Sequence, residues 1–304
     1  MKKTDISVKL ANLKLKNPVI TASGTSGFGK ELEEYISLND IGAITLKGLT
    51  LNPRKGNPTP RIAETPCGIL NSIGLENPGV NSFINNQLSL LNNCSSPVIA
   101  NISGHSIDEY TKLAEKLNPH KKISALEINV SCPNLKKGGM AFGINSEQIY
   151  TITSNVRKVF NREIIVKLTP NVSDIVKMAQ AAKEGGADIL SLINTLQGIA
   201  IDIDSEKPVL ANTFGGLSGP AIKPVALRMV YQVYSSVNIP IIGMGGISSG
   251  KDAIEFIMAG ASAVGVGTAT LVDPYAILRI IKEIEEILQN KNIDNLNNLR
   301  GKAQ

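Results

Sequence analysis

Two lysines interrupt otherwise apolar runs of this 304-residue chain at positions where they could act on a ligand. Lys47 lies in AITLKG (43–48), and Lys167 lies in IIVKLTP (164–170). An ammonium group in an apolar strand costs free energy unless it meets a partner. Both lysines therefore predict a bound anion or a negative charge that develops during a reaction. The simpler alternative is that each lysine packs its aliphatic stem against apolar residues and places its ammonium group in solvent.

Hydroxyl and amide side chains occupy equivalent positions in the other apolar runs. They are Ser23, Asn101, Asn129, Asn194 and Thr195. Amides both donate and accept hydrogen bonds, which suits recognition of a polar ring. A single asparagine is usually a cap or turn residue, but the set as a whole predicts a polar pocket with a positive floor.

Two glycine-containing segments near the C-terminal end of the chain predict a phosphate site. Gly245–Gly246 closes one apolar run, and Gly267–Thr268 closes the next. Glycine lets the backbone approach a ligand closely, and backbone N–H groups at such turns bind phosphate. The pattern GMGGIxSG occurs in barrels that bind FMN and in barrels that bind sugar phosphates, so this pattern alone leaves both open.

Cys132 ends the run ALEINVSC (125–132) in a Ser–Cys–Pro–Asn setting and is the candidate catalytic base. The alternative is a buried apolar thiol, which we assign to Cys67 and Cys94. Three cysteines far apart in sequence, with no CxxC cluster, predict no disulfide framework. They also predict no metal site or iron–sulfur centre in this chain. Sparse cysteine usage suits a reducing, cytoplasmic compartment.

Eight apolar runs alternate with amphipathic helical stretches, which predicts a (β/α)8 barrel in the α/β class. An open doubly wound sheet would usually carry GxGxxG, and the sequence has none. Residues 1–304 are expected to form one domain, with a hairpin at 6–16 and long βα-loop insertions at 49–75 and 196–222. The predicted strands are 18–23, 43–48, 97–104, 125–132, 164–170, 188–195, 240–247 and 263–269. The predicted helices are 31–38, 106–118, 146–160, 174–184, 224–237, 250–259 and 274–290.

Composition excludes several function classes. The net charge is +5 and the lysines are dispersed, which argues against nucleic-acid binding and suits small anionic ligands. No apolar run approaches the ~18 residues of a membrane helix. The N-terminal residues alternate polar and apolar, so we predict no signal peptide.

The motifs together resemble the class 1 dihydroorotate dehydrogenases, in order and over nearly the whole chain. The B-type is the nearest match, through NTLQGIAIDIDSEKPVLANTFGGLSGPAIKP (194–224). Class 2 enzymes have an N-terminal extension and a catalytic serine, where this chain has Cys132. Other matching segments are TASGT (21–25), ITLKGLTLNPRKGNPTPR (44–61), GILNSIGLENPG (68–79), ANISG (100–104), EINVSCPN (127–134), VKLTPN (166–171), IIGMGGISSGKDA (241–253) and VGVGTA (264–269).

The resemblance implies a role for each matching position. Cys132 would remove a proton from dihydroorotate while FMN takes a hydride, giving orotate for pyrimidine biosynthesis. The residues implied to hold FMN are Ser23, Lys47, Gly48, Asn101, Asn129, Lys167, Ile193, Gly219, Gly245, Gly246, Gly267 and Thr268. Those implied to bind the substrate are Lys47, Asn71, Ser72, Ile73, Gly74, Leu75, Asn129, Asn194 and Thr195.

The resemblance also implies a route for the electrons. B-type enzymes pass them to NAD+ through a partner subunit with FAD and a 2Fe–2S cluster, in a heterotetramer of two catalytic and two electron-transfer chains. An A-type enzyme that uses fumarate is the alternative, and a flavin-free sugar-phosphate barrel or a non-catalytic binding barrel are more distant ones. Residues 133–143 are glycine-rich and basic, so we predict a lid there. His105 is expected either at the pocket rim or as an ordinary loop residue.

Overall fold

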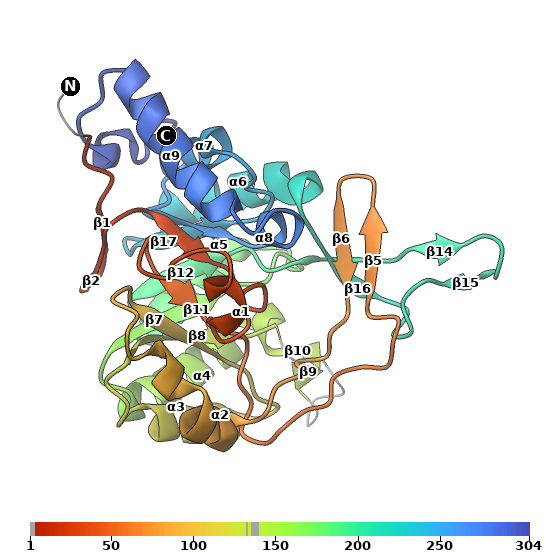
Figure 1. Ribbon diagram of the computed structural model, residues 1–304. Coiled ribbons are helices and arrows are strands. Elements are labelled where there is room, and N and C mark those ends of the chain that lie inside the picture. The colour runs from red at the N-terminus through yellow and green to blue at the C-terminus, as the bar shows by residue number, and fades with distance from the viewer. Residues whose placement is uncertain (1–3, 132, 135–139) are drawn as a thin grey trace.

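The eight predicted strands form one parallel sheet that closes into a barrel (Figure 1). The computed structural model describes residues 4–131, 133–134 and 140–304. The first and last strands of the sheet meet through a parallel bridge between Ile20 and Ala43. This confirms the predicted (β/α)8 architecture. In sheet order the strands are β3 (Val19–Thr21), β18 (Ala263–Val266), β17 (Ile241–Met244), β12 (Ile189–Leu192), β11 (Glu163–Lys167), β8 (Ile123–Asn129), β7 (Val98–Ile102) and β4 (Ile44–Thr45).

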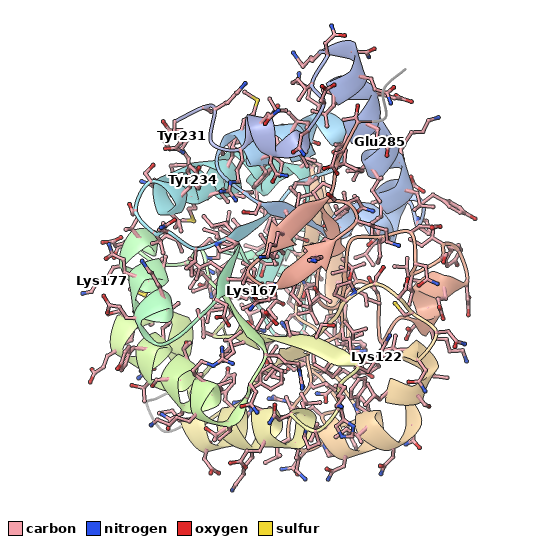
Figure 2. The ribbon with its side chains drawn as sticks, turned by 90° about the vertical axis from the view of Figure 1, so that its left-hand side faces the viewer. Lys122, Lys167, Lys177, Tyr231, Tyr234 and Glu285 are labelled. Atoms are coloured by element: carbon pink, nitrogen blue, oxygen red, sulfur yellow. The ribbon has the colours of Figure 1, made fainter. Side chains whose placement is uncertain are left out.

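The strands are buried because both of their faces are covered. Aliphatic side chains fill the space between sheet and helices, and every residue of β7, β11, β17 and β18 is buried. Such near-continuous apolar strands are typical of parallel sheets. Figure 2 shows the contrast between Lys167, in the middle of the molecule, and Lys177, which points outward from a peripheral helix. Lys167 is one of the few charged side chains that the described barrel interior has to accommodate.

The helices largely follow the predicted segments. Two helices were not predicted, α2 and α8, because both are short and lie in loop-like sequence. The helix predicted over 31–38 is shorter than expected: α1 ends at Glu33, and a turn then places Ile36 in the core. The helices are α1 (Lys30–Glu33), α2 (Val80–Asn86), α3 (Ile107–Leu117), α4 (Ser146–Val159), α5 (Ile175–Glu184), α6 (Lys223–Tyr234), α7 (Gly250–Met258), α8 (Thr268–Val272) and α9 (Ala276–Asn290). None of them, within the described ranges, is long and apolar enough to cross a membrane.

The two long insertions pair with each other, although about 140 residues separate them in sequence. Together they form a four-stranded antiparallel sheet in the order β13 (Leu196–Gly198), β16 (Gly215–Ser218), β6 (Gly68–Asn71) and β5 (Ile62–Thr65). Leu70 faces Leu217 across the central pair. A further hairpin, β14 (Ile201–Asp202) and β15 (Lys207–Pro208), extends away from the barrel (Figure 1). The sequence did not predict this sheet, because its short glycine-containing strands lack regular alternation.

The predicted N-terminal hairpin is present as β1 (Val8–Leu10) and β2 (Leu13–Leu15). Its alternate residues are buried against the core, which is the pattern of a sheet with one solvated face. A second short pair, β9 (Pro133–Asn134) and β10 (Met140–Ala141), follows β8. Four 3-10 helices complete the described chain: η1 (Leu88–Leu91), η3 (Phe142–Ile144), η4 (Pro220–Ile222) and η5 (Leu296–Leu299).

A capping box fixes the start of α7, directly after the loop that follows β17. The Ser249 hydroxyl accepts from the Asp252 backbone N–H, and the Asp252 carboxylate accepts from the Ser249 backbone N–H at 2.9 Å. Lys223 of α6 donates to Asp252 at 2.6 Å and to Glu255 at 2.8 Å. Burial alone would raise the pKa of Asp252, but the hydrogen bonds from Lys223, Ser248 and Ser249 outweigh it and lower the pKa to about 2.

Replacing this carboxylate should therefore destabilise the fold in a pH-dependent way. The folded-state pKa lies below the unfolded value of 3.8, so the ionised group stabilises the protein above pH ~4 and loses that effect as the pH falls toward ~2. Asp252→Asn should lower the free energy of unfolding by about 2 kcal/mol at pH 7 and by roughly half that at pH 3. Urea unfolding at both pH values measures this.

Glu64→Gln, at an exposed position of β5, is the control. It should leave the free energy of unfolding nearly unchanged at both pH values. An Asp252→Asn loss that is the same at pH 7 and pH 3 would show that the ionised carboxylate is not the stabilising species.

Candidate active site

The polar residues singled out in the sequence gather at the C-terminal ends of the barrel strands. Lys167 ends β11, where it lies in register with Asn129 of β8 and Ser191 of β12. Asn101 of β7 lies in register with Glu127 of β8. Because all eight strands are parallel, their ends form one mouth, and barrel enzymes place their active sites there.

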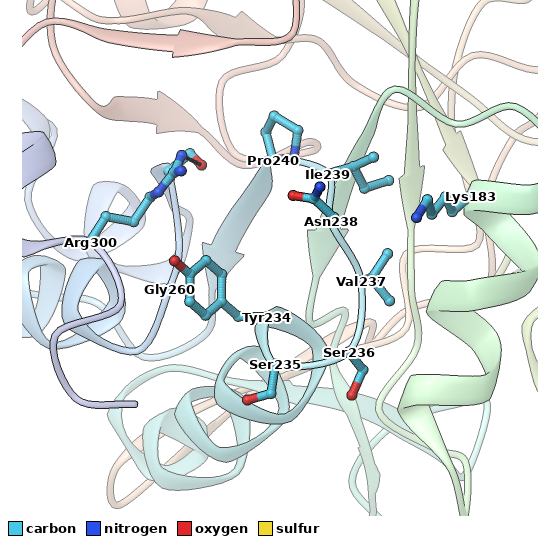
Figure 3. A pocket seen from close by; sticks show the side chains of 11 residues that line it. Lys183, Tyr234, Ser235, Ser236, Val237, Asn238, Ile239, Pro240, Gly260 and Arg300 are labelled. Atoms are coloured by element: carbon cyan, nitrogen blue, oxygen red, sulfur yellow. Dashed lines mark hydrogen bonds between the residues drawn. The ribbon is translucent and has the colours of Figure 1, made fainter.

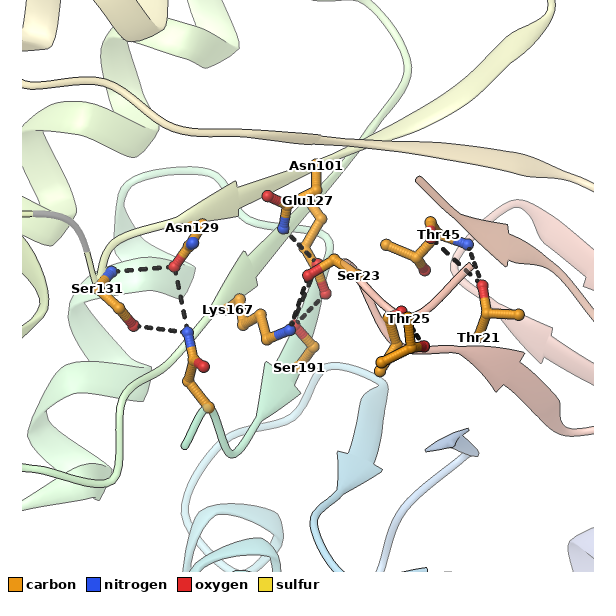
Figure 4. Close-up of polar contacts among 12 residues, drawn as sticks. Thr21, Ser23, Thr25, Thr45, Asn101, Glu127, Asn129, Ser131, Lys167 and Ser191 are labelled. Atoms are coloured by element: carbon orange, nitrogen blue, oxygen red, sulfur yellow. Dashed lines mark hydrogen bonds and ion pairs between the residues drawn. The ribbon is translucent and has the colours of Figure 1, made fainter. Parts of the chain in front are cut away.

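A buried ionic network joins five strands at this mouth (Figure 4). The Nζ of Lys167 donates to the Ser23 hydroxyl at 3.1 Å and lies 3.9 Å from the Glu127 carboxylate. That carboxylate also accepts from the Asn101 amide at 2.6 Å and from the Ser191 hydroxyl at 2.8 Å. The side chains of Lys167 and Glu127 are only 7% and 2% exposed. Lys167 is thus compensated inside the barrel and does not extend to solvent.

Glu127 is the residue of this network that the sequence interpretation missed. It interrupts ALEIN two residues before Asn129, and this spacing places both side chains on the same side of a strand. A charged residue flanked by Leu and Ile in a strand buried on both faces was the available signal. Ser191 gave a weaker sequence signal, because a buried serine often has no role in ligand binding.

A second cluster of amides lies beside the network, at the ends of β8 and β12. The Asn194 amide donates to the Asn129 side-chain oxygen at 3.3 Å and to the Ser131 hydroxyl at 2.9 Å. The Tyr110 hydroxyl of α3 donates to the Asn129 carbonyl at 2.6 Å. These contacts orient Asn194 toward Asn129, two of the predicted substrate-binding asparagines. Figure 4 shows Asn129 beside Ser131 at the end of β8. Thr195 follows Asn194, and its carbonyl accepts from the Asn171 amide at 3.1 Å.

The predicted phosphate glycines converge from three loops. Gly246 has a φ of +76°, and a Cβ there would lie 2.9 Å from the Gly219 carbonyl oxygen. A Cβ on Gly219 would in turn lie 3.5 Å from the Thr268 methyl group, and one on Gly245 would lie 3.3 Å from Ile193. Gly267 precedes the first residue of α8. The backbone here leaves no room for side chains, as a close backbone approach to a ligand requires.

Residues Asn71 to Leu75 leave β6 and run along the mouth. The Asn71 amide donates to the Gly216 carbonyl of β16 at 3.3 Å, so the four-stranded sheet holds the start of this segment. Ser72 accepts from the Asn57 amide through its carbonyl and its hydroxyl. Gly74 and Leu75 both adopt positive φ, and Leu75 lies within 3.5 Å of a Cβ built on Gly48. Ile73 accepts from the Asn57 backbone N–H through its carbonyl.

Unpartnered polar groups remain beside these contacts. Lys47 is half-buried, and no ion pair joins it to a carboxylate in the described part of the chain. The Ser103 hydroxyl is buried without a hydrogen-bond partner among the described residues. It lies 3.9 Å from a Cβ built on Gly48, a position where the Asn101 side-chain oxygen already approaches to 3.0 Å. Buried hydroxyls are normally hydrogen-bonded, so Ser103 and Lys47 have capacity for a ligand.

His105 follows β7, and its ring contacts the Arg54 guanidinium while its backbone N–H donates to Glu109 at 2.7 Å. Its place at the pocket rim stays a prediction. Cys132 lies outside the described residues, as do residues 135–139 of the predicted lid. The assignments made for them therefore remain predictions. Cys94 is buried as predicted for a core thiol, but the same prediction is wrong for Cys67, which is exposed because it lies in the turn between β5 and β6.

The donor set fits a flavin mononucleotide. A phosphate needs backbone N–H groups at close range, which the convergent glycines offer. The pyrimidine edge of a flavin needs hydrogen-bonding groups and a cation, which the Asn101 side chain, Lys47 and Lys167 supply. The buried Ser103 hydroxyl adds hydrogen-bonding capacity near Gly48, where the lack of a side chain lets the backbone lie close to the Asn101 oxygen.

A surface hollow at the opposite end of the barrel does not share these features (Figure 3). It is lined by Tyr234, Pro240, Gly260 and Arg300, among others. Pro240 and Ser262 immediately precede β17 and β18, so the hollow lies at the N-terminal ends of the strands. Barrel residues at that end usually serve stability.

Comparisons with known proteins agree with this geometry. A model of the family described as dihydroorotate dehydrogenase matches residues 5–288. The chain is 56% identical, over 98% of both chains, to a protein of Thermoanaerobacter pseudethanolicus named dihydroorotate dehydrogenase B (NAD(+)), catalytic subunit. A Geobacter metallireducens protein of the same name is 52% identical over 100% of both chains. A crystal structure of DHODH in complex with ferulenol from Eimeria tenella has the same fold, with a TM-score of 0.83 at 23% identity over 98% of this chain and 88% of that one.

The glycine cradle yields a prediction about FMN affinity. Gly246→Ala should weaken FMN binding about tenfold or more, because the new methyl group meets the Gly219 carbonyl and the Lys223 backbone. Quenching of flavin fluorescence during titration measures the affinity. Gly186→Ala is the matched control, since it also has positive φ but meets only the side chain of Arg157, far from the mouth. Equal loss of FMN affinity in both variants would contradict a specific role of the cradle.

Proposed function

We propose, because the chain belongs to the dihydroorotate dehydrogenase family, that it oxidises (S)-dihydroorotate to orotate in pyrimidine biosynthesis as a single FMN-binding domain of residues 1–304. The observation that carries the proposal is the donor set at the barrel mouth, where Lys167, Asn101 and Asn129 lie near the C-terminal ends of strands in the same sheet whose following loops carry the glycine cradle. A sugar-phosphate barrel would account for the glycines. It would not account for a buried lysine and a row of amides beside them.

The cofactor is held by groups from every side of the mouth. Lys167, Ser23 and Asn101 would hold the flavin ring, with Lys47 and Gly48 from the β4 end. Gly219, Gly245, Gly246, Gly267 and Thr268 hold the phosphate, and Ile193 with Asn129 completes the set. When bound, FMN supplies the site for hydride acceptance, which no side chain can provide.

The substrate is recognised by amides and one cation. Orotate carries a carboxylate and two ring amide groups, so it needs both donors and acceptors. Asn129 and Asn194 are already oriented by mutual contact and by Ser131. Residues Asn71 to Leu75 cover the ring, with Thr195 beside them, and Lys47 offers a cation without a carboxylate partner in the described part of the chain.

Cys132 acts as the base that removes the C5 proton. Cys67 and Cys94 do not share its Ser–Cys–Pro–Asn context. Only a small share of an ordinary thiol, with a pKa of ~8.5, is thiolate at neutral pH. The Asn129 and Asn194 amides position the substrate, so the thiolate needs to act only on one carbon.

Electrons leave toward NAD+ through a partner subunit. The relatives in both Thermoanaerobacter and Geobacter are named catalytic subunits of an NAD(+) enzyme, which favours the B-type over the fumarate-using alternative. We propose that the partner carries FAD and a 2Fe–2S cluster and that two copies of each chain form a cytoplasmic heterotetramer. Among the described residues, no group of three or more His, Cys, Asp or Glu side chains could hold a metal ion.

Cys132→Ala should keep FMN and still bind orotate, because it removes only the proton acceptor. Its anaerobic flavin bleaching by dihydroorotate should be slower by about 10²-fold or more, as expected for loss of a general base. Wild-type bleaching should rise from pH 6 to pH 9 as the thiolate fraction increases. Cys67→Ala is the control and should bleach at the wild-type rate. Bleaching of Cys132→Ala at the wild-type rate, or a flat wild-type profile, would show that another group is the base.

The acceptor assignment is tested by purifying the chain alone and with its partner. The chain alone should be yellow and should reduce neither fumarate nor NAD+ at a substantial rate. Adding the electron-transfer subunit should give NAD+ reduction that depends on dihydroorotate. Fumarate-driven turnover by the chain alone would establish the A-type chemistry instead, and a colourless protein that cannot be reconstituted with FMN would refute a flavoenzyme.

A further inference from the structure

Glu127 is a buried acid that the proposed function leaves without a role. Three acidic side chains are buried in the described part of the chain: Glu127, Glu163 and Asp252. Glu163 begins β11, at the end of the barrel opposite the mouth, and Asp252 caps α7. Glu127 alone of the three lies among the residues proposed to hold the flavin. A carboxylate beside a site for an anionic cofactor is unfavourable in itself, so its presence calls for a physical reason.

Both oxygens of the Glu127 carboxylate are engaged. One accepts from the Asn101 amide at 2.6 Å and lies 3.9 Å from the Lys167 Nζ, and the other accepts from the Ser191 hydroxyl at 2.8 Å. These partners come from β7, β11 and β12, so the carboxylate connects three strands to its own strand β8 (Figure 4). The distance to Lys167 is longer than a hydrogen bond. Ser23 is the hydrogen-bond acceptor of that ammonium among the described residues.

We infer that Glu127 is a positioning residue that orients Asn101 and Lys167 and reduces the positive field that Lys167 presents to the flavin. The inference rests on the proposed function. An amide held by a carboxylate donates its N–H inward, which leaves the Asn101 side-chain oxygen on the other side, 3.0 Å from a Cβ built on Gly48. Glu127 therefore fixes which group of Asn101 faces the space at Gly48. The same carboxylate offsets one of the two lysine charges at the mouth.

This charge balance affects the redox potential of the bound cofactor. Two-electron reduction of FMN with uptake of one proton adds one negative charge to the flavin. Lys167 stabilises that charge, and Glu127 opposes it through the same buried, poorly screened surroundings. With Glu127 ionised, the reduced flavin is held less tightly than Lys167 alone would hold it. The effect lowers the potential and favours passing the electrons to the next acceptor.

The test is the potential of FMN bound to Glu127→Gln, measured by anaerobic titration against a reference dye without substrate. Glutamine keeps the shape and removes the charge. The ratio of affinities for reduced over oxidised FMN should rise about tenfold, which corresponds to about 30 mV for a two-electron couple. Glu163→Gln is the matched control, a buried carboxylate at the other end of the barrel, and its potential should equal that of the wild type. An unchanged or lowered potential in Glu127→Gln would overturn the charge role.

Glu127→Asp separates charge from position and serves if the glutamine variant does not fold. Aspartate keeps the charge but withdraws it from Asn101 and Ser191 by one methylene. FMN affinity should fall about tenfold while the potential stays close to the wild-type value, because tenfold corresponds to roughly the 1.4 kcal/mol of one charge-assisted hydrogen bond. Unchanged FMN affinity would overturn the positioning role, and a potential shifted in aspartate as in glutamine would overturn the charge role.

The outcome for the wild type separates this inference from the proposed function. A wild-type protein that binds no FMN would refute the proposed function itself. A wild-type protein that binds FMN, with Glu127 variants that have its affinity and potential, would refute the inference alone.

Discussion

A charged ammonium inside an aliphatic barrel carries a large desolvation cost, and the site depends on how this chain meets that cost at Lys167. Glu127 compensates the charge, Ser23 accepts a hydrogen bond, and Asn101 and Ser191 complete the coordination of the carboxylate. A buried pair of this kind adds little net stability, yet removal of one member leaves an unpaired charge that is strongly destabilising. The network therefore ties the geometry of the mouth to the integrity of the fold. Five strand ends must be in register for all of its contacts to form.

The register is in turn a consequence of features far from the mouth. Parallel strands buried on both faces cannot slip by one residue without turning Lys167 and Glu127 into the helix layer. Aliphatic packing between sheet and helices sets the depth of each strand, and the Ile20–Ala43 bridge closes the ring. The four-stranded sheet of the two insertions then holds Asn71 at the start of the segment whose Leu75 lies close to Gly48. In this way rigid elements, and not the loops alone, position the groups that face the ligand.

The sequence was sufficient for the barrel and for most of the mouth. All eight strands could be predicted because each is a continuous apolar run, and Lys167 and Asn101 stood out against that background. The pairing of the insertions could not be predicted, because strands as short as Gly215–Ser218 carry no periodic signal and their partner lies about 140 residues away. Glu127 was not predicted, because polar side chains were expected at the strand ends and this one lies two residues before the end of β8. Its role appears only when neighbouring strands are placed side by side.

The two lysines at the mouth, which look alike in sequence, perform different physical tasks in the structure. Lys167 is 7% exposed and its charge is balanced by Glu127, so the electric field of this pair falls off quickly with distance. Lys47 is half-buried and has no carboxylate partner in the described part of the chain, so its charge is available to a carboxylate or to a developing anion. An enzyme that binds an anionic substrate next to an anionic reduced cofactor needs both kinds. Two uncompensated cations would hold the negative charges too firmly to release them, and two compensated ones would not attract the substrate.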